Sequence, residues 1–140
     1  MLIQYWNGSR IFMNVYDKFI DTMKQHSLNK GAVIDVLNIY VNGGKFLQYL
    51  EDFKNKQGER REYHGVIYSE EYEKDDEDYF GENKVLFYSG DDDDAYDIVN
   101  YNEMYKYLSV ACKFYIEMYK DKKNIVNEKL LLIKKIYGVK

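Results

Sequence analysis

The residues with the clearest capacity for chemistry are carboxylates, and they are concentrated between Glu70 and Asp97. This stretch holds thirteen acidic residues and two lysines, a formal charge of −11, while the whole chain of 140 residues carries −4. The remainder therefore sums to +7, which predicts a mildly basic body with one intensely acidic face. Like charges this close repel one another and resist desolvation, so they cost folding free energy unless solvent or a partner compensates them.

Three interpretations of the acidic segment are open. It can be a pair of solvated loops that keep a sheet edge soluble and monomeric. It can bind calcium, although the pattern D-x-[DN]-x-[DN]-G is absent and consecutive aspartates cannot all face one ion. It can recognise a basic protein surface, because aromatic residues interleave with the acids and add apolar anchors to a charge that steers association.

The third interpretation names a set of partner-binding residues and a kind of partner. A protein with a positive cleft, such as a nuclease, is complementary to this segment, because an acidic patch can occupy a groove that binds phosphates. The residues expected at or near the contact are Glu73, Asp75, Asp76, Glu77, Asp78, Tyr79, Asp91, Asp92, Asp93, Asp94 and Tyr96.

Other reactive side chains are sparse. His26 and His64 are the two histidines, and Cys112 is the single cysteine. They make no Cys-His or Ser-His-Asp arrangement of recognisable spacing, and a zinc site needs more His or Cys than this. Gly43-Gly44 is too weak a signal for a phosphate-binding loop. We therefore expect no catalytic residues, no metal site and no cofactor.

The composition is that of a globular protein, with 46% hydrophobic and 17% aromatic residues. The length fits a single domain over residues 1–140. One cysteine excludes an internal disulfide and suits a reducing compartment. No apolar run approaches the roughly 18–20 residues that span a bilayer, and residues 1–6 lack a secretory signal pattern. We expect a cytoplasmic protein that has no membrane partner and, given its negative charge, does not bind nucleic acid.

Helical patterns dominate the amino-terminal part of the chain. From a cap at Ser9, apolar residues recur at helical spacing as far as Met23, which predicts an amphipathic helix ending near Ser27. Residues 33–41 carry a second apolar stripe at helical spacing, in which the β-branched residues leave a strand open. Residues 46–53 continue with a further helical turn or two.

The middle of the chain is typical of strands and the end of helices. Residues 63–68, 85–88 and 96–99 are rich in β-forming residues, and their short connections favour an antiparallel arrangement. A long helix opens at Asn100, and a basic helix occupies residues 121–137. The predicted fold is α+β: one domain whose short antiparallel sheet, of three strands or more, packs against amino- and carboxy-terminal helices.

Part of the chain resembles a known family. The segments DIVNYNEMYKYL at residues 97–108 and ACKFY at residues 111–115 are similar to bacterial immunity proteins of contact-dependent growth inhibition systems, the CdiI group that neutralises ribonuclease toxins. The final Leu/Ile/Lys-rich helix and the acidic stretch with Tyr79-Phe80 before a strand also look similar. The resemblance covers roughly the carboxy-terminal half of the chain.

The resemblance implies a small cytoplasmic α+β protein without catalysis of its own. Such a protein would bind a cognate toxin domain with a basic surface, the carboxy-terminal nuclease of a CdiA protein, and block its active site or its approach to RNA. Met104 stands where Phe is expected, and Lys113-Phe114 where an acidic-basic pair is common, so the identity of the toxin stays open. An acidic regulatory module and a calcium-binding protein are the alternatives.

Overall fold

The computed structural model describes residues 2–6 and 10–140. After an amino-terminal β-hairpin, helices lie toward both ends of the chain and strands lie in its middle. The main sheet is antiparallel, in the order β3 (Glu59–Arg60), β4 (His64–Tyr68), β5 (Lys84–Ser89), β6 (Tyr96–Asn100). The helices are α1 (Val15–Gln25), α2 (Gly31–Asn42), α3 (Phe46–Lys54), α4 (Tyr101–Met118) and α5 (Lys123–Ile136). The predicted α+β fold is confirmed, and the short β3 makes the sheet larger than three strands.

The first helix begins later than the sequence predicts. Strand β2 (Arg10–Asn14) pairs antiparallel with β1 (Leu2–Trp6), and the expected cap at Ser9 lies outside the described residues. The observed cap is Asn14, whose side-chain oxygen accepts a hydrogen bond of 2.9 Å from the N–H of Asp17. The apolar residues before Asn14 are consecutive, so periodicity alone cannot separate helix from strand there, and the pairing with β1 decides.

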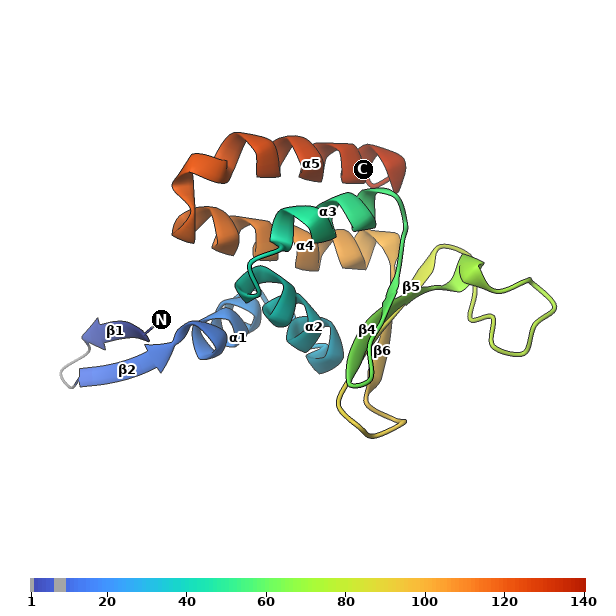
Figure 1. Cartoon of the computed structure of the whole chain (residues 1–140), viewed down its shortest axis with the longest axis horizontal. Coiled ribbons are helices and arrows are strands. Elements are labelled where there is room, and N and C mark those ends of the chain that lie inside the picture. The colour runs from blue at the N-terminus through green and yellow to red at the C-terminus, as the bar shows by residue number, and fades with distance from the viewer. Residues whose placement is uncertain (1, 7–9) are drawn as a thin grey trace.

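Helix α2 covers one face of the main sheet (Figure 1). Eight of its twelve residues are buried, among them Val33, Val36 and Leu37 with no exposed surface. The facing strand residues, such as Val85 and Phe87, are also fully buried. The segment that the sequence left open between helix and strand is therefore a helix, and its β-branched residues are tolerated because they fill the core.

Helix α5 packs against both α3 and α4, and these helices lie on the same side of the sheet as α2 (Figure 1). Glu51 of α3 receives a hydrogen bond of 2.8 Å from Lys129 of α5 and a contact of 2.5 Å from Lys54. These bonds lower the pKa of Glu51 to about 2. None of the helices in the described part of the chain combines the length and apolar character that crossing a bilayer requires.

Tyr137 joins three elements in the core. Its hydroxyl donates a hydrogen bond of 2.6 Å to the carbonyl of Phe53, next to the end of α3, and forms a further hydrogen bond with the hydroxyl of Tyr68 on β4. Burial raises the pKa of both Tyr68 and Tyr137 well above the ordinary value, so both phenols are neutral. This pair links the end of α5 to α3 and to the sheet.

Replacing Tyr137 by Phe should therefore destabilise the fold. The change leaves the buried Tyr68 hydroxyl without its hydrogen-bond partner, which costs about 1–3 kcal/mol. The Phe53 carbonyl loses one of two hydrogen bonds and keeps the one from the N–H of Lys56. Urea denaturation of the parent and of Tyr137→Phe measures the difference. Tyr119→Phe is the control, because Tyr119 is 44% exposed. Equal unfolding free energies for the two variants would show that the Tyr68–Tyr137 pair does not hold the core.

Candidate functional site

The face of the main sheet opposite α2 is only partly covered, and we call it the open sheet face. The strand register places Ile67, Leu86 and Ile98 in one row across it and Tyr88 beside Tyr96 in the next. Each is half-buried except Tyr96, which is 47% exposed. Apolar and aromatic side chains thus meet solvent on a rigid sheet, which is typical of an interaction surface.

Tyr88 is held in place across β4. Its ring lies against Gly65, where an added Cβ would come within 2.5 Å of the Tyr88 Cε1 and hydroxyl oxygen and 2.4 Å of the Glu59 carbonyl oxygen. The Tyr88 hydroxyl donates a hydrogen bond of 2.5 Å to the carbonyl of Arg61. The glycine therefore makes room for a fixed aromatic side chain on the open sheet face.

Residues 90–95, here the Asp91 loop, connect β5 to β6 beside that face. Asp91, Asp92, Asp93 and Asp94 are all exposed, and Asp92 Oδ1 accepts a hydrogen bond of 3.0 Å from the N–H of Asp94. The loop borders a shallow hollow of about 380 Å³, lined by Glu62, Leu86, Tyr88, Gly90, Asp91, Asp92, Asp93 and Tyr96. Carboxylates and phenol rings together suit a Lys or Arg side chain of a partner, whose apolar stem can lie on the rings.

Residues 72–83, here the Asp75 loop, connect β4 to β5. Its acids Glu73, Asp75, Asp76, Glu77, Asp78 and Glu82 are exposed, whereas Tyr79 is half-buried. The loop is fixed at its base, where the N–H of Phe80 donates a hydrogen bond of 3.0 Å to Ser69 Oγ. The part of the loop that carries the candidate binding acids therefore projects from an anchored base (Figure 1).

Three acids of the segment serve the fold. Glu71 accepts a hydrogen bond of 2.7 Å from the N–H of Tyr68, and Glu70 accepts one of 3.1 Å from the N–H of Asn83. Asp97 accepts one of 2.8 Å from the N–H of Ala32, in the first turn of α2. Charge counting could not identify these acids, because their partners are backbone groups that only the folded chain brings near.

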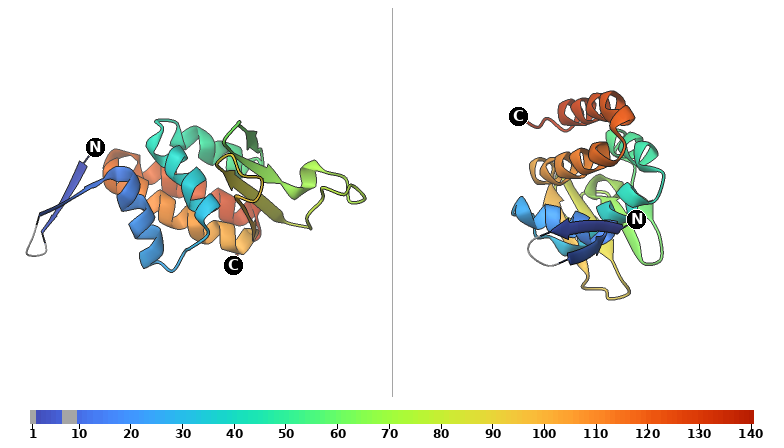
Figure 2. Two further views of the ribbon diagram at one scale, coloured as in Figure 1. Left: turned by 90° about the horizontal axis from the view of Figure 1, so that it is seen from below. Right: turned by 90° about the vertical axis from the view of Figure 1, so that its left-hand side faces the viewer.

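The expectation of one continuous acidic face is wrong. The Asp75 loop joins β4 to β5 and the Asp91 loop joins β5 to β6, so the two loops lie at opposite ends of β5. A strand of six residues spans about 20 Å. Figure 1 shows them projecting in different directions, and in Figure 2 the Asp75 loop lies at the end of the molecule away from the β1–β2 hairpin.

The histidines and the cysteine do not come together. His26 follows α1, His64 lies on β4 and Cys112 is buried in α4. Within residues 2–6 and 10–140, no three or more His, Cys, Asp and Glu side chains form a group suited to a metal ion, so the calcium interpretation finds no support in this geometry. Burial raises the pKa of the Cys112 thiol to about 12, which keeps it protonated and unreactive.

The sequence did not single out Glu62 or Leu86, which line the hollow. All four residues from Val85 to Tyr88 are apolar or aromatic, so no alternation indicates which of them face solvent. The position of Leu86 follows only from the register with β4 and β6.

Comparison with family models gives one finding. The model of a family described as CDI immunity protein matches residues 30–130, which include the whole main sheet, both acidic loops and part of α5. The match starts well before the half of the chain in which the resemblance was recognised. Curated proteins and solved structures give no match.

Gly65→Ala tests how Tyr88 is held. The new methyl group has to displace either the Tyr88 ring or β3, which should destabilise the protein by about 1–3 kcal/mol. Gly31→Ala is the matched control, because nothing lies within 4 Å of its added Cβ. Urea denaturation compares the two. If Gly65→Ala unfolds at the same urea concentration as Gly31→Ala, close packing does not fix Tyr88.

Proposed function

The chain belongs to the family of CDI immunity proteins, and on this premise we propose that it binds and neutralises a cognate ribonuclease toxin, the carboxy-terminal domain of a CdiA protein. The protein is an antitoxin and has no catalytic role. Its acidic, tyrosine-rich surface blocks the active site of the toxin or its access to RNA. Because the RNA target lies inside the cell, we place this action in the cytoplasm.

The strongest support for the proposal is the negative charge of the two acidic loops, which none of the described basic side chains neutralises. The exposed acids of both loops form no ion pair with a lysine or arginine in the part of the chain that the structure describes. A ribonuclease needs a positive cleft to bind RNA. Charges of opposite sign on the two proteins raise the rate of encounter and disfavour acidic partners.

Aromatic residues next to this charge provide affinity. Tyr88 and Tyr96 stand side by side on β5 and β6, with Leu86 next to them on the open sheet face. Tyrosines bury a large apolar area and dominate the energetics of many interfaces. Tyr88 is also held in place by its hydrogen bond to the Arg61 carbonyl, which lowers the conformational entropy lost on binding. We infer that these side chains form the centre of the contact and the aspartates its rim.

The separation of the two loops is compatible with one toxin domain. A standard interface buries about 800 Å² on each partner, a patch roughly 30 Å across, whereas β5 spans about 20 Å. A toxin lying along the open sheet face can therefore touch both loops. The proposed contacts are Glu73, Asp75, Asp76, Glu77, Asp78 and Tyr79 of the Asp75 loop, and Asp91, Asp92, Asp93, Asp94 and Tyr96 at the Asp91 loop.

Removing charge from one loop at a time tests this surface. Changing Asp91, Asp92, Asp93 and Asp94 to Asn should weaken toxin binding about tenfold or more, since each rim charge contributes a few tenths of a kcal/mol. The same treatment of residues 75–78 tests the other loop. Binding kinetics on immobilised toxin domain and inhibition of its RNase activity are the measurements.

The control removes the same charge elsewhere. Asp17→Asn, Glu117→Gln, Asp121→Asn and Glu128→Gln, combined, change four exposed acids outside the sheet and its loops. This variant should bind the toxin almost as the parent does. Equal weakening by the control and the loop variants would mean that net charge, and not this surface, governs binding. Thermal unfolding checks that each variant folds.

The dependence of the binding rates on ionic strength distinguishes long-range electrostatic attraction from short-range contacts with the toxin. Raising NaCl from about 50 to about 500 mM should slow association about tenfold while changing dissociation about twofold or less, because salt screens long-range attraction more than close contacts. Stopped-flow mixing measures both rates. An association rate that does not respond to salt would contradict the electrostatic part of the proposal.

A further inference from the structure

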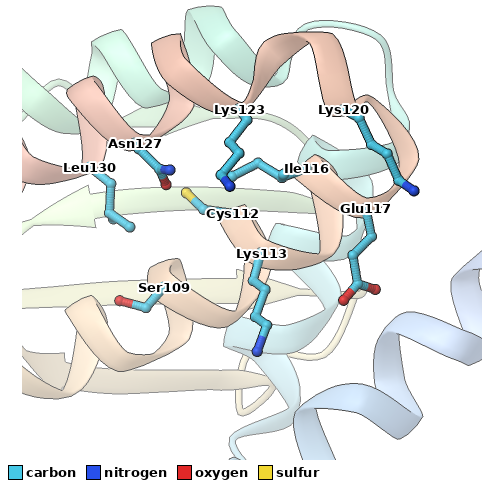
Figure 3. Close-up of a pocket in the computed structure, with 9 residues that line it drawn as sticks. All are labelled: Ser109, Cys112, Lys113, Ile116, Glu117, Lys120, Lys123, Asn127 and Leu130. Atoms are coloured by element: carbon cyan, nitrogen blue, oxygen red, sulfur yellow. The ribbon is translucent and has the colours of Figure 1, made fainter.

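A second hollow lies between α4 and α5, near their connection (Figure 3). That connection is far from the two acidic loops (Figure 1). Its volume is about 540 Å³, within the range of about 300–1,000 Å³ that small-molecule sites occupy. It is lined by Ser109, Cys112, Lys113, Ile116, Glu117, Lys120, Lys123, Asn127 and Leu130.

The floor of this pocket is aliphatic. Cys112 is 1% exposed, and Ile116 and Leu130 are half-buried beside it. Since the thiol is protonated, it acts here as a small apolar group. No aromatic residue occurs among the nine lining residues that the structure describes. The floor therefore favours an alkyl chain over a ring that would stack, such as a nucleobase.

The rim carries positive charge from both helices. Lys113 comes from α4, Lys120 from the short 3-10 helix that follows it (Lys120–Lys122) and Lys123 from α5, against the single acid Glu117. None of the three lysines forms an ion pair within the described ranges of the chain. In Figure 3, Lys123 extends from α5 toward α4 beside Ile116. An anionic group at the rim would neutralise charge that the protein itself leaves unpaired.

We propose that this pocket binds a free medium-chain fatty acid. The alkyl chain lies on Cys112, Ile116 and Leu130, and the carboxylate is held by Lys123, while Lys113 and Lys120 add positive charge at the rim. Two features together select this ligand: an aliphatic floor, which takes a hydrocarbon chain, and a cationic rim, which takes a single negative head group. The binding is non-covalent, and the site is separate from the proposed toxin surface.

Three ten-carbon amphiphiles of different charge test the proposal. Isothermal titration calorimetry below micellar concentrations should show that decanoate binds tightest, that decan-1-ol binds about fivefold or more weakly, and that decylammonium does not bind. Equal affinity for decanoate and decan-1-ol would overturn the role of the lysines. Absence of decanoate binding would overturn the site itself.

Charge variants locate the site. Lys113→Gln, Lys120→Gln and Lys123→Gln, combined, should weaken decanoate binding about tenfold and leave decan-1-ol binding unchanged. The control Lys106→Gln, Lys134→Gln and Lys135→Gln removes the same charge from parts of α4 and α5 outside the pocket and should change neither. If the control weakens decanoate as much as the pocket variant, the effect is one of net charge and the proposal fails.

A substitution in the pocket floor and a binding measurement in the presence of the toxin domain complete the test. Leu130→Glu puts a negative charge beside the alkyl chain and should abolish decanoate binding, with circular dichroism as the check of folding. Decanoate should bind the protein and its toxin complex with equal affinity. Loss of decanoate binding on addition of the toxin domain would assign the pocket to the protein interface and overturn the proposal.

Discussion

The burial of helix α2 against one face of the sheet is the constraint on which the rest of the structure depends. This helix contacts α1, α4, β5 and β6, and its first turn is tied to β6 by Asp97 and by Lys30, whose ammonium donates a hydrogen bond of 3.0 Å to the carbonyl of Ile98. Because α2 covers only one face of a sheet, the side chains of the opposite face are left to solvent or to a partner.

The fold tolerates its acidic segment because apolar burial contributes more free energy than the repulsion between the carboxylates costs. Each large apolar side chain buried around α2 stabilises the fold by about 1.5–3 kcal/mol. Two exposed carboxylates about 10 Å apart in water repel by about 0.4 kcal/mol, and salt reduces this further. The acids are also divided between two loops at opposite ends of β5, and Glu70, Glu71 and Asp97 are stabilised by backbone N–H groups. The self-repulsion is therefore a modest cost.

The two surfaces of the molecule differ in sign and in apolar character. The open sheet face combines tyrosines with carboxylates, whereas the pocket between α4 and α5 combines aliphatic groups with lysines. On the two proposals made above, opposite potentials on separate surfaces would let one small protein bind a basic toxin and an anionic ligand without competition. Both surfaces belong to the segment that matches the family, residues 30–130.

Local signals in the chain sufficed for the α+β class, for helix α4 and its start near Asn100, for the strand segments and for the family resemblance. Periodicity, composition and charge are properties of neighbouring residues. Long-range pairing decided the rest. Pairing with β1 moved the start of α1 to Val15, and the register of β5 turned Leu86 and Tyr88 outward. The order of the strands separated the two acidic loops, since a count of charges along a chain contains no distances between them.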